Sequence, residues 1–273
     1  MEIVKMQCVS DCIDMCGAAW KLGWHEYHAG NISYRLTQEE RSIVQAQAKR
    51  QGQWVSLSTQ VPTLAGEYFL ASAGGSSFRA LENKPERDLG ILEINGDGSA
   101  YRTLWGFENG RPTSELPAHL MNHEIKRQVS GDRYRIIYHA HPTNLIALSF
   151  VLPLSDEVFT RELWEMEPEC AMTFPGGIGV LPWITPASVE SAIETGNKMR
   201  EYDIVLWAYH GAFCAGETFE ATLGLMHTVE KAAEMLVKVM SLGGKRQRPS
   251  VDNFNALKEP FGLNLPDRFL FER

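Results

Sequence analysis

The spacing of apolar residues along the chain predicts a series of amphipathic helices. Between about residues 4 and 23, Cys8, Cys12 and Cys16 recur every four positions, which places them on one helix face that the core would bury. Residues 37–53 are mostly polar, which predicts a surface insertion or an exposed helix. The other expected helices run from a Ser114 cap to about Gln128, from a Thr143 cap to about Val151, near 155–167, near 186–201 and over 217–242.

Short apolar runs bounded by turn residues predict strands between these helices. The runs Leu89–Ile94 and Ala100–Trp105 flank an Asn-Gly-Asp-Gly turn, so they should pair as an antiparallel hairpin. The strand that starts at Tyr68 is expected to enter a Gly/Ser loop at 74–77. Further strands are expected at Ile32–Leu36, Arg133–His141, Cys170–Phe174, Ile178–Val180 and Asp203–Tyr209.

Composition adds a bound on the domain organisation. The chain has 273 residues, of which 44% are hydrophobic and 22% are charged, as is typical of a globular protein. No repeat, linker or low-complexity segment divides it. We therefore expect one α/β domain over residues 1–273, with a sheet that is at least partly antiparallel.

Charge and cysteine content exclude several classes of protein. The 34 Asp and Glu outnumber the 26 Lys and Arg, and a net charge of −8 argues against a nucleic-acid partner. No apolar run is long enough for a membrane span, and the N-terminus lacks a signal-peptide pattern, so a cytoplasmic protein without membrane contact is expected. The five cysteines include no C-x-x-C pair, which argues against a thiolate metal site.

Two histidines at the end of one strand are the strongest chemical signal. Side chains alternate between the faces of a strand, so His139 and His141 should project from the same side and could bind a metal together. His210 is the best third ligand, because it ends another apolar strand and Gly211 permits a close approach there. A histidine in an apolar strand can also be a hydrogen-bonded core residue, so this alternative stays open for His210.

Glu115 is a candidate carboxylate beside that metal. It follows Ser114 at an expected helix start, where it could complement the helix dipole or act as a base or fourth ligand. A rival pair, His119 and His123, lacks the glutamate of an H-E-x-x-H protease site. Metal-dependent hydrolysis is a weaker interpretation of the H-x-H strand, because a helix follows it instead of further ligands.

The chain resembles the class II aldolase/epimerase family over nearly its whole length. The resemblance implies a central, mainly antiparallel sheet flanked by helix layers, and a cyclic homotetramer with active sites near subunit boundaries. The segments that carry it are Trp20–Trp24, Gly30-Asn31, Pro112–His119, His139–Leu148, Phe159–Glu165, Gly179–Trp183, His210-Gly211 and Glu230-Lys231.

The same resemblance implies roles for individual residues. His139, His141 and His210 match the ligands of one Zn²⁺ per chain. Glu115 matches the glutamate that serves as base, and Glu169 matches one that a neighbouring subunit receives. The implied reaction is reversible retro-aldol cleavage of a phosphorylated ketose, L-rhamnulose 1-phosphate, to dihydroxyacetone phosphate and L-lactaldehyde.

Amide-rich loops match the family's phosphate site. Their glycines and hydroxyl side chains suit an anion, and the last of them lies at a helix N-terminus. The chain departs from the family pattern at His28, where an Asn is usual, and at Gly74, where a Ser is usual. The matching positions are His28, Gly30, Asn31, Gly74, Gly75, Thr113 and Ser114.

Three alternatives use the same histidines. Cleavage of fuculose 1-phosphate and epimerisation of ribulose phosphate belong to the same family, but those relatives are shorter between the positions of Asn31 and Glu115. A binding or scaffold protein would hold a structural metal with all four coordination positions filled by protein. Imidazole and carboxylate ligands also suit Co²⁺ or Fe²⁺, so the sequence does not fix the metal.

Overall fold

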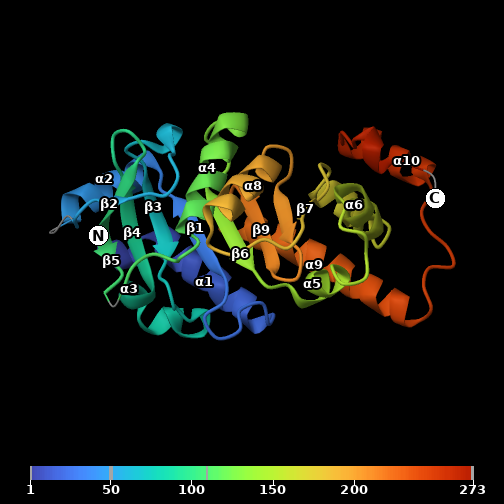
Figure 1. Cartoon of the computed structure of the whole chain (residues 1–273), viewed down its shortest axis with the longest axis horizontal. Coiled ribbons are helices and arrows are strands. Elements are labelled where there is room, and N and C mark those ends of the chain that lie inside the picture. Colours follow the sequence, from blue (N-terminus) through green and yellow to red (C-terminus); the bar gives the residue numbers. More distant parts are fainter. Residues whose placement is uncertain (1, 49–51, 109, 272–273) are drawn as a thin grey trace.

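The computed structural model describes residues 2–48, 52–108 and 110–271, and the strands of these residues form one sheet (Figure 1). The strands are β1 (Asn31–Arg35), β2 (Val55–Ser56), β3 (Tyr68–Ser72), β4 (Leu89–Ile94), β5 (Ala100–Gly106), β6 (Ile136–Ala140), β7 (Gly179–Leu181), β8 (Ile204–Trp207) and β9 (Gly211–Gly216). Their order across the sheet is β2-β5-β4-β3-β1-β6-β9-β8-β7.

Neighbouring strands pair antiparallel everywhere except between β7 and β8, which are parallel. The hairpin of β4 and β5 is closed by Asn95, whose side-chain oxygen accepts the backbone N–H groups of Ser99 and Ala100. The expectation of a mainly antiparallel central sheet is confirmed. That the whole of residues 1–273 forms one domain stays a prediction.

Helices cover both faces of this sheet (Figure 1). They are α1 (Gln7–Lys21), α2 (Gln38–Gln47), α3 (Pro85–Asp88), α4 (Leu116–Ser130), α5 (Thr143–Leu148), α6 (Asp156–Trp164), α7 (Pro168–Thr173), α8 (Val189–Met199), α9 (Phe219–Ser241) and α10 (Val251–Phe261). Helix α4 packs on α8, β6 and β1, whereas α9 packs on α1, α5 and β9. No helix in the described part of the chain is long and apolar enough to cross a membrane.

Strand alternation decides which side chains meet each helix layer. Ser33 of β1 hydrogen-bonds to His119 of α4, so α4 covers the face to which Ser33 points. Ser33 pairs with Ile137 of β6, and His139 lies two positions further along that strand, so it points to the same face. Tyr34 packs against Phe219 of α9 with the two rings tilted, so α9 covers the opposite face. The functional residues near His139 therefore lie between the sheet and the α4 layer.

The first helix and its cysteines agree with expectation. Cys8, Cys12 and Cys16 are buried on α1 and are free thiols. In the polar stretch 37–53, α2 begins with a capping box between Thr37 and Glu40, and residues 49–51 of the stretch lie outside the described residues. The exposed-helix interpretation is confirmed for Gln38–Gln47, although Val44 is buried.

Several expected elements were wrong. Cys170–Phe174 was expected as a strand, but the chain forms helix α7 there, started by Pro168 in its first turn and packed on α9. Ser114 does not cap α4, since the helix begins after Glu115, and Thr143 is the first residue of α5 and not its cap. Strand β9 and helix α10 were not expected from the sequence at all.

Candidate metal centre

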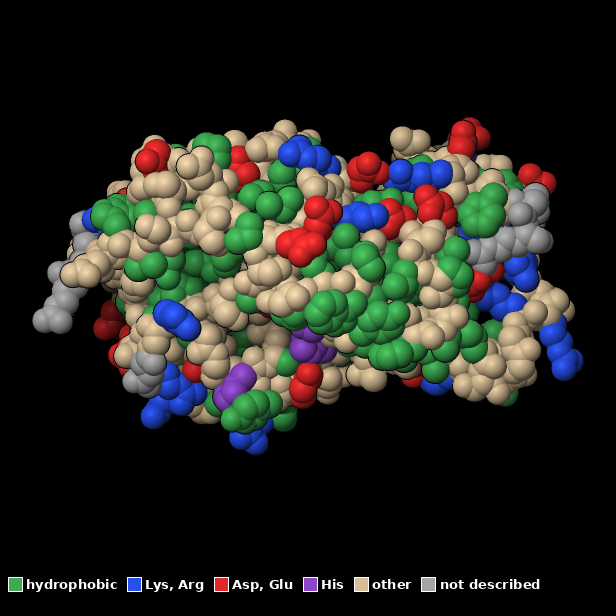
Figure 2. All heavy atoms as spheres, in the orientation of Figure 1, with side chains coloured by type: hydrophobic (Ala, Val, Ile, Leu, Met, Phe, Trp, Pro, Cys, Tyr) green, Lys and Arg blue, Asp and Glu red, His purple; other side chains and the backbone are tan. Residues whose placement is uncertain are grey.

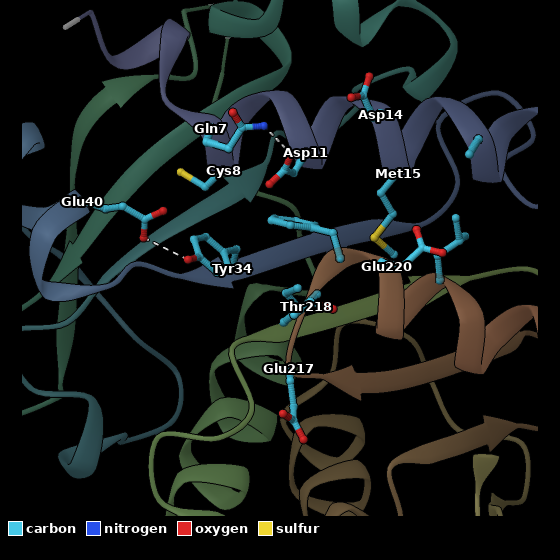
Figure 3. Close-up of a pocket in the computed structure, with 14 residues that line it drawn as sticks. Gln7, Cys8, Asp11, Asp14, Met15, Tyr34, Glu40, Glu217, Thr218 and Glu220 are labelled. Carbon is cyan, nitrogen blue, oxygen red and sulfur yellow. Dashed lines mark hydrogen bonds between the residues drawn. The ribbon is translucent and has the colours of Figure 1, made fainter. Parts of the chain in front are cut away.

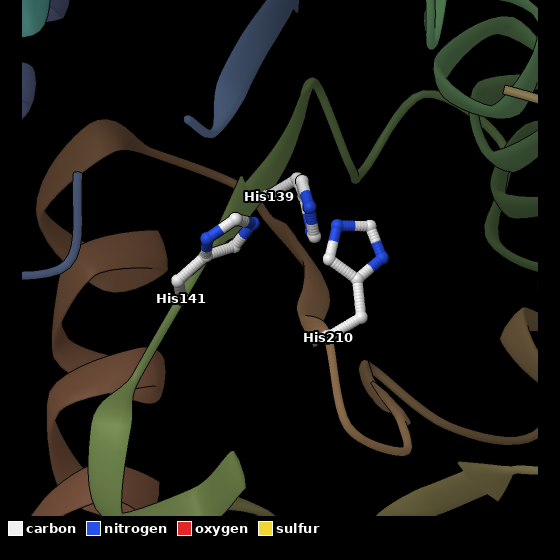
Figure 4. A group of neighbouring side chains, drawn as sticks. All are labelled: His139, His141 and His210. Carbon is white, nitrogen blue, oxygen red and sulfur yellow. The ribbon is translucent and has the colours of Figure 1, made fainter. Parts of the chain in front are cut away.

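Three histidines converge where β6 and β9 lie side by side (Figure 4). His139 lies in β6, His141 follows one residue after its end, and His210 precedes β9. Antiparallel pairing of Ala140 with Ala212 places the end of one strand beside the start of the other. One nitrogen from each ring lies within 4.8 Å of the others, so the sequence prediction that these three residues come together is realised in the structure.

Hydrogen bonds through Nδ1 orient the rings of His139 and His141 and leave the Nε2 atom of each ring for an ion. Nδ1 of His139 donates to the carbonyl of Ala212 at 3.0 Å, and Nδ1 of His141 donates to Glu26 at 2.6 Å. Nε2 of His139 is buried and lacks a hydrogen-bond partner in the described structure. An unpaired buried nitrogen is unfavourable, and a divalent cation bound by three imidazoles would remove that cost. The residues present therefore fit a metal such as Zn²⁺.

Gly211 makes the close approach of the strands possible. A Cβ atom at this position would lie 2.5 Å from the carbonyl oxygen of Ala140, and 2.8 Å from ring carbons of both His139 and His141. Real Cβ atoms essentially never approach other atoms so closely. The expectation that a glycine is needed beside His210 is thus explained by the packing of the two other rings.

The electrostatic environment keeps His139 and His210 neutral. Burial lowers the pKa of His139 well below its ordinary value, and the neighbouring His141 and His210 lower it further. Burial, with a contribution from His141, lowers the pKa of His210 to about 4. Neutral imidazole is the form that binds metals, so no proton has to leave these two rings near pH 7.

The Glu115 carboxylate adjoins this cluster. Its Oε2 lies 3.7 Å from Nε2 of His139 and accepts a 2.6 Å hydrogen bond from the side-chain amide of Asn31. Burial raises the pKa of Glu115, although the Asn31 hydrogen bond and the charge of His141 act in the opposite direction. A raised pKa brings a carboxyl group closer to the range in which it can both take and give a proton.

The segments expected to hold a phosphate lie next to one another. Nδ1 of His28 donates to the carbonyl of Ser76, which joins the first segment to the Gly74-Gly75 loop. The amide of Gly74 in turn donates to the carbonyl of Arg111, and Ala73 pairs with Pro112. His28, Gly74 and Gly75 line a cavity of about 410 Å³ together with Ala73, Ser77, Arg87, Asp88 and Gly110.

Within these segments, some donors are already engaged in the protein. Besides the Gly74 amide, the amide of Thr113 donates to the carbonyl of Ser72. The hydroxyl of Thr113 accepts a hydrogen bond from the amide of Glu115. Gly30 has a φ of +78°, and a Cβ there would lie 2.8 Å from the carbonyl oxygen of His139. Gly30 therefore lets the loop run directly against the strand that carries His139.

Glu169 does not join the histidine cluster of its own chain. It is exposed on the first turn of α7, which packs on α6, α9 and α10. Its expected role in a neighbouring subunit's site stays a prediction.

Sequence reasoning missed Glu26. This residue is separated from His141 by 115 positions, yet it accepts the hydrogen bond that orients the ring. Burial opposes ionisation of Glu26, but the hydrogen bond and charge of His141 and the other neighbours lower its pKa overall. No local pattern signals such a long-range contact. Only the folded structure brings the two residues together.

A second cavity, of about 640 Å³, lies apart from the histidines between α1, β1 and the start of α9 (Figure 3). Its described lining has no Lys, Arg or His side chain. An anionic ligand would be repelled there, so this cavity does not compete with the histidine cluster as a site for a phosphorylated molecule. Its carboxylates come from Asp11, Asp14, Glu40, Glu217 and Glu220.

The surface beside the metal centre is partly apolar. Tyr209, the neighbour of His210, has a positive φ of 67° and packs edge-on against Phe150, and both side chains are exposed. Val151, the next residue after Phe150, is also exposed. Figure 2 shows histidine side chains reaching the surface next to apolar side chains. His141 and His210 are partly exposed, so the cluster is accessible from outside the chain.

The fold and the site together match a known family. Residues 10–237 match the family model described as class II aldolase and adducin N-terminal domain, and the chain belongs to this family. The resemblance noted from the sequence is thereby confirmed.

Individual relatives cover most of the chain. It is 43% identical over 252 residues to a rhamnulose-1-phosphate aldolase from Mannheimia succiniciproducens, with 92% of this chain and 93% of the relative covered. It is 44% identical over 245 residues to a rhamnulose-1-phosphate aldolase from Yersinia pestis, with 89% of each covered. The crystal structure of a sugar-phosphate aldolase from Thermotoga maritima superposes with a TM-score of 0.74 at 29% identity, covering 86% of this chain and 95% of that one.

Proposed function

We propose that the protein is a lyase, a metal-dependent class II aldolase that reversibly cleaves L-rhamnulose 1-phosphate to dihydroxyacetone phosphate and L-lactaldehyde in rhamnose catabolism. The observation that carries the proposal is the cluster of His139, His141 and His210 with the Glu115 carboxylate 3.7 Å from one ring. The substrate is inferred from relatives at 43–44% identity that carry this name.

His139, His141 and His210 would hold one Zn²⁺ per chain, and the fixed tautomer of His139 and the Glu26 contact of His141 support this assignment. When bound, the ion supplies Lewis-acid polarisation of the substrate carbonyl. Three protein ligands leave coordination positions open, as in catalytic and not structural sites.

The chain's own carboxylates would move the protons. Cleavage of the bond between C3 and C4 transfers one proton, overall, from the C4 hydroxyl to C3 of the dihydroxyacetone phosphate fragment. Glu115 would exchange the proton at C3, and its buried position beside the histidine cluster supports this role. Glu169 of a neighbouring subunit would take the proton from the C4 hydroxyl, which is consistent with its exposed position on α7.

The substrate phosphate would be held by the adjoining segments that contain His28, Gly30, Asn31, Gly74, Gly75, Thr113 and Ser114. The net charge of −8 opposes a small anion at long range, so local amides, hydroxyls and His28 would provide the attraction, in a cavity that Arg87 also lines. Because the amides of Gly74 and Thr113 already donate to carbonyls, the remaining donors of these loops would bind the phosphate.

We also propose that the protein acts in the cytoplasm as a homotetramer with active sites near subunit boundaries. Phe150, which packs against Tyr209 next to His210, and the adjacent Val151 are exposed apolar side chains that support a subunit contact there. A carboxylate donated by a neighbour can reach only a site that lies near such a contact.

Parallel assays would test the proposal and separate it from its nearest alternatives. L-Rhamnulose 1-phosphate, L-fuculose 1-phosphate and ribulose 5-phosphate are given to the same purified preparation, and the first should have the highest kcat/KM. A preference for fuculose 1-phosphate would reassign the substrate, and a preference for ribulose phosphate would replace the proposed lyase by an epimerase. Turnover of none of the three, with a fully coordinated metal, would favour a structural metal site.

A further inference from the structure

A chain of buried polar side chains leads from the α4 layer to Glu115. Nε2 of His123 lies 2.9 Å from the hydroxyl of Ser33, and that hydroxyl lies 2.8 Å from Nδ1 of His119. Nε2 of His119 then contacts the side-chain oxygen of Asn31. The amide nitrogen of Asn31 donates to Oε2 of Glu115 at 2.6 Å.

The chemistry of these groups allows only one order of donors and acceptors along this series of hydrogen bonds. A carboxylate only accepts hydrogen bonds, so the amide nitrogen of Asn31 must face Glu115 and its oxygen must face His119. His119 must then carry its proton on Nε2, which leaves Nδ1 as the acceptor for the Ser33 hydroxyl. Each group fixes the orientation of the next one towards Glu115.

His123 completes the chain at its far end. Once the Ser33 hydroxyl donates to His119, its oxygen is free to accept, and Nε2–H of His123 is the donor at hand. His123 is itself held in the core, where its ring packs 4.9 Å from that of Phe69. The chain of hydrogen bonds is thus anchored on a rigid helix and a central strand.

Because these side chains are buried, breaking one of their hydrogen bonds would cost free energy. Asn31, Ser33, His119 and His123 are all at least nine-tenths buried, between β1 and α4. Water therefore cannot easily replace a lost partner, and an unmatched polar group would stay in the core. Burying two histidines and a serine costs free energy unless each has a hydrogen-bond partner, whereas apolar residues in the same places would need none.

We propose that Ser33, His119 and His123 are positioning residues, which act through Asn31 to hold the Glu115 carboxylate in place for proton transfer. The inference rests on the proposed function in one respect, because it takes Glu115 as the group that exchanges the substrate proton. None of the three residues needs to touch substrate or metal. His119 is the central member, since its ring contacts both Ser33 and Asn31.

Two substitutions of similar size at His119 separate positioning from packing. His119→Gln can place an amide nitrogen near the Nε2 position and still donate to Asn31, whereas His119→Asn reaches only the Nδ1 position and loses that donor. His119→Asn should lower kcat about 10–100-fold, while His119→Gln should retain kcat within about threefold. KM and bound metal should be unchanged in both variants. Equal kcat values in the two variants, or an effect on KM alone, would overturn the proposal.

Ser33→Ala tests the next link and has a matched control. It should lower kcat about tenfold or more, because His119 then lacks the donor that fixes its tautomer. Ser191→Ala removes another fully buried serine hydroxyl, which bonds to the carbonyl of Ser188 on α8, away from the chain to Glu115. Ser191→Ala should cost similar stability in urea unfolding without lowering kcat. A Ser33→Ala enzyme with unaltered kcat would contradict the proposal.

Nitrogen-15 NMR of the unmodified protein tests the proposal without any variant or assay. The ring signals of His119 should show a neutral Nε2–H tautomer at neutral pH, and a proton on Nδ1 would overturn the proposed direction. This readout also separates the two hypotheses. If the wild-type protein cleaves none of the sugar phosphates, the proposed function fails, while the His119 tautomer still decides whether the directed chain exists.

Discussion

Replacing Gly211 with alanine perturbs the candidate metal centre through a single methyl group. The added Cβ would lie 2.8 Å from Cε1 of His139 and from Cδ2 of His141, and 2.5 Å from the carbonyl oxygen of Ala140. Ordinary contacts begin at 3.4 Å, so the rings would have to move apart by about 0.6 Å each. Metal–ligand distances tolerate deviations of only about 0.2 Å, so the ligand geometry should be lost.

Two consequences of Gly211→Ala can be measured separately. Zinc affinity, determined by competition with a chelator of known affinity, should fall by about 10–100-fold or more, as is typical when ligands lose their orientation. The free energy of unfolding of the metal-free protein should fall by about 1–3 kcal/mol, the usual cost of overpacking.

Gly17→Ala is the matched control for this experiment. A Cβ at Gly17 meets no atom within 4 Å, and the position lies inside α1. This variant should keep wild-type zinc affinity and gain up to about 1 kcal/mol of stability from the better helix propensity of alanine. Wild-type zinc affinity in Gly211→Ala would refute the argument that the packed rings at Gly211 are the metal ligands.

Three further predictions follow from the same structure. Glu115→Gln should keep its zinc but lose about 10²–10⁴-fold in kcat, and unaltered turnover would remove Glu115 from the mechanism. Glu26→Ala should weaken zinc binding about tenfold or more, because His141 loses the acceptor at 2.6 Å; unchanged affinity in chelator competition would contradict this role. Burial lowers the pKa of His25 to about 4 and that of His119 to about 3, so the folded protein binds fewer protons than the unfolded chain, whose histidines titrate near 6.5. Stability in urea should therefore fall as the pH drops below about 6.5, by about 2.5 kcal/mol per histidine at pH 4.5, and His119→Gln should show a smaller loss.

The sequence was sufficient where a strong pattern coincided with local geometry. The H-x-H pair at the end of an apolar strand predicted converging rings, because a strand holds alternate side chains on one face. The Asn-Gly-Asp-Gly turn likewise predicted the β4–β5 hairpin, and the structure has both features.

Weak or ambiguous patterns explain the errors. Cys170–Phe174 is a short apolar run that suits a buried strand or a buried helix equally well, and packing on α9 decided for the helix. Residues 211–216, Gly-Ala-Phe-Cys-Ala-Gly, are poor in β-formers, and they form β9 because they pair with β6 and β8 on both sides. Pro260 conceals α10, which extends through that residue.

Long-range partners in the site could not be read from local patterns. Glu26 and His141, or Ser33 and His119, are joined only because β1 and the loop before it lie against β6 and α4. In the sequence, the i, i+4 spacing of His119 and His123 is that of a metal site, but the pair lacks the glutamate of an H-E-x-x-H motif. In the structure the two rings share one serine hydroxyl, a partner that lies about 90 positions earlier in the chain.

The central claim is that cleavage of L-rhamnulose 1-phosphate depends on a metal held by His139, His141 and His210. The most direct test follows dihydroxyacetone phosphate release by one preparation before exhaustive chelation, after it, and after zinc is restored. The protein should carry about one zinc per chain at the start. Chelation should abolish release, and added zinc should restore it in proportion to the metal bound. Full release of dihydroxyacetone phosphate by the metal-free protein would contradict the claim.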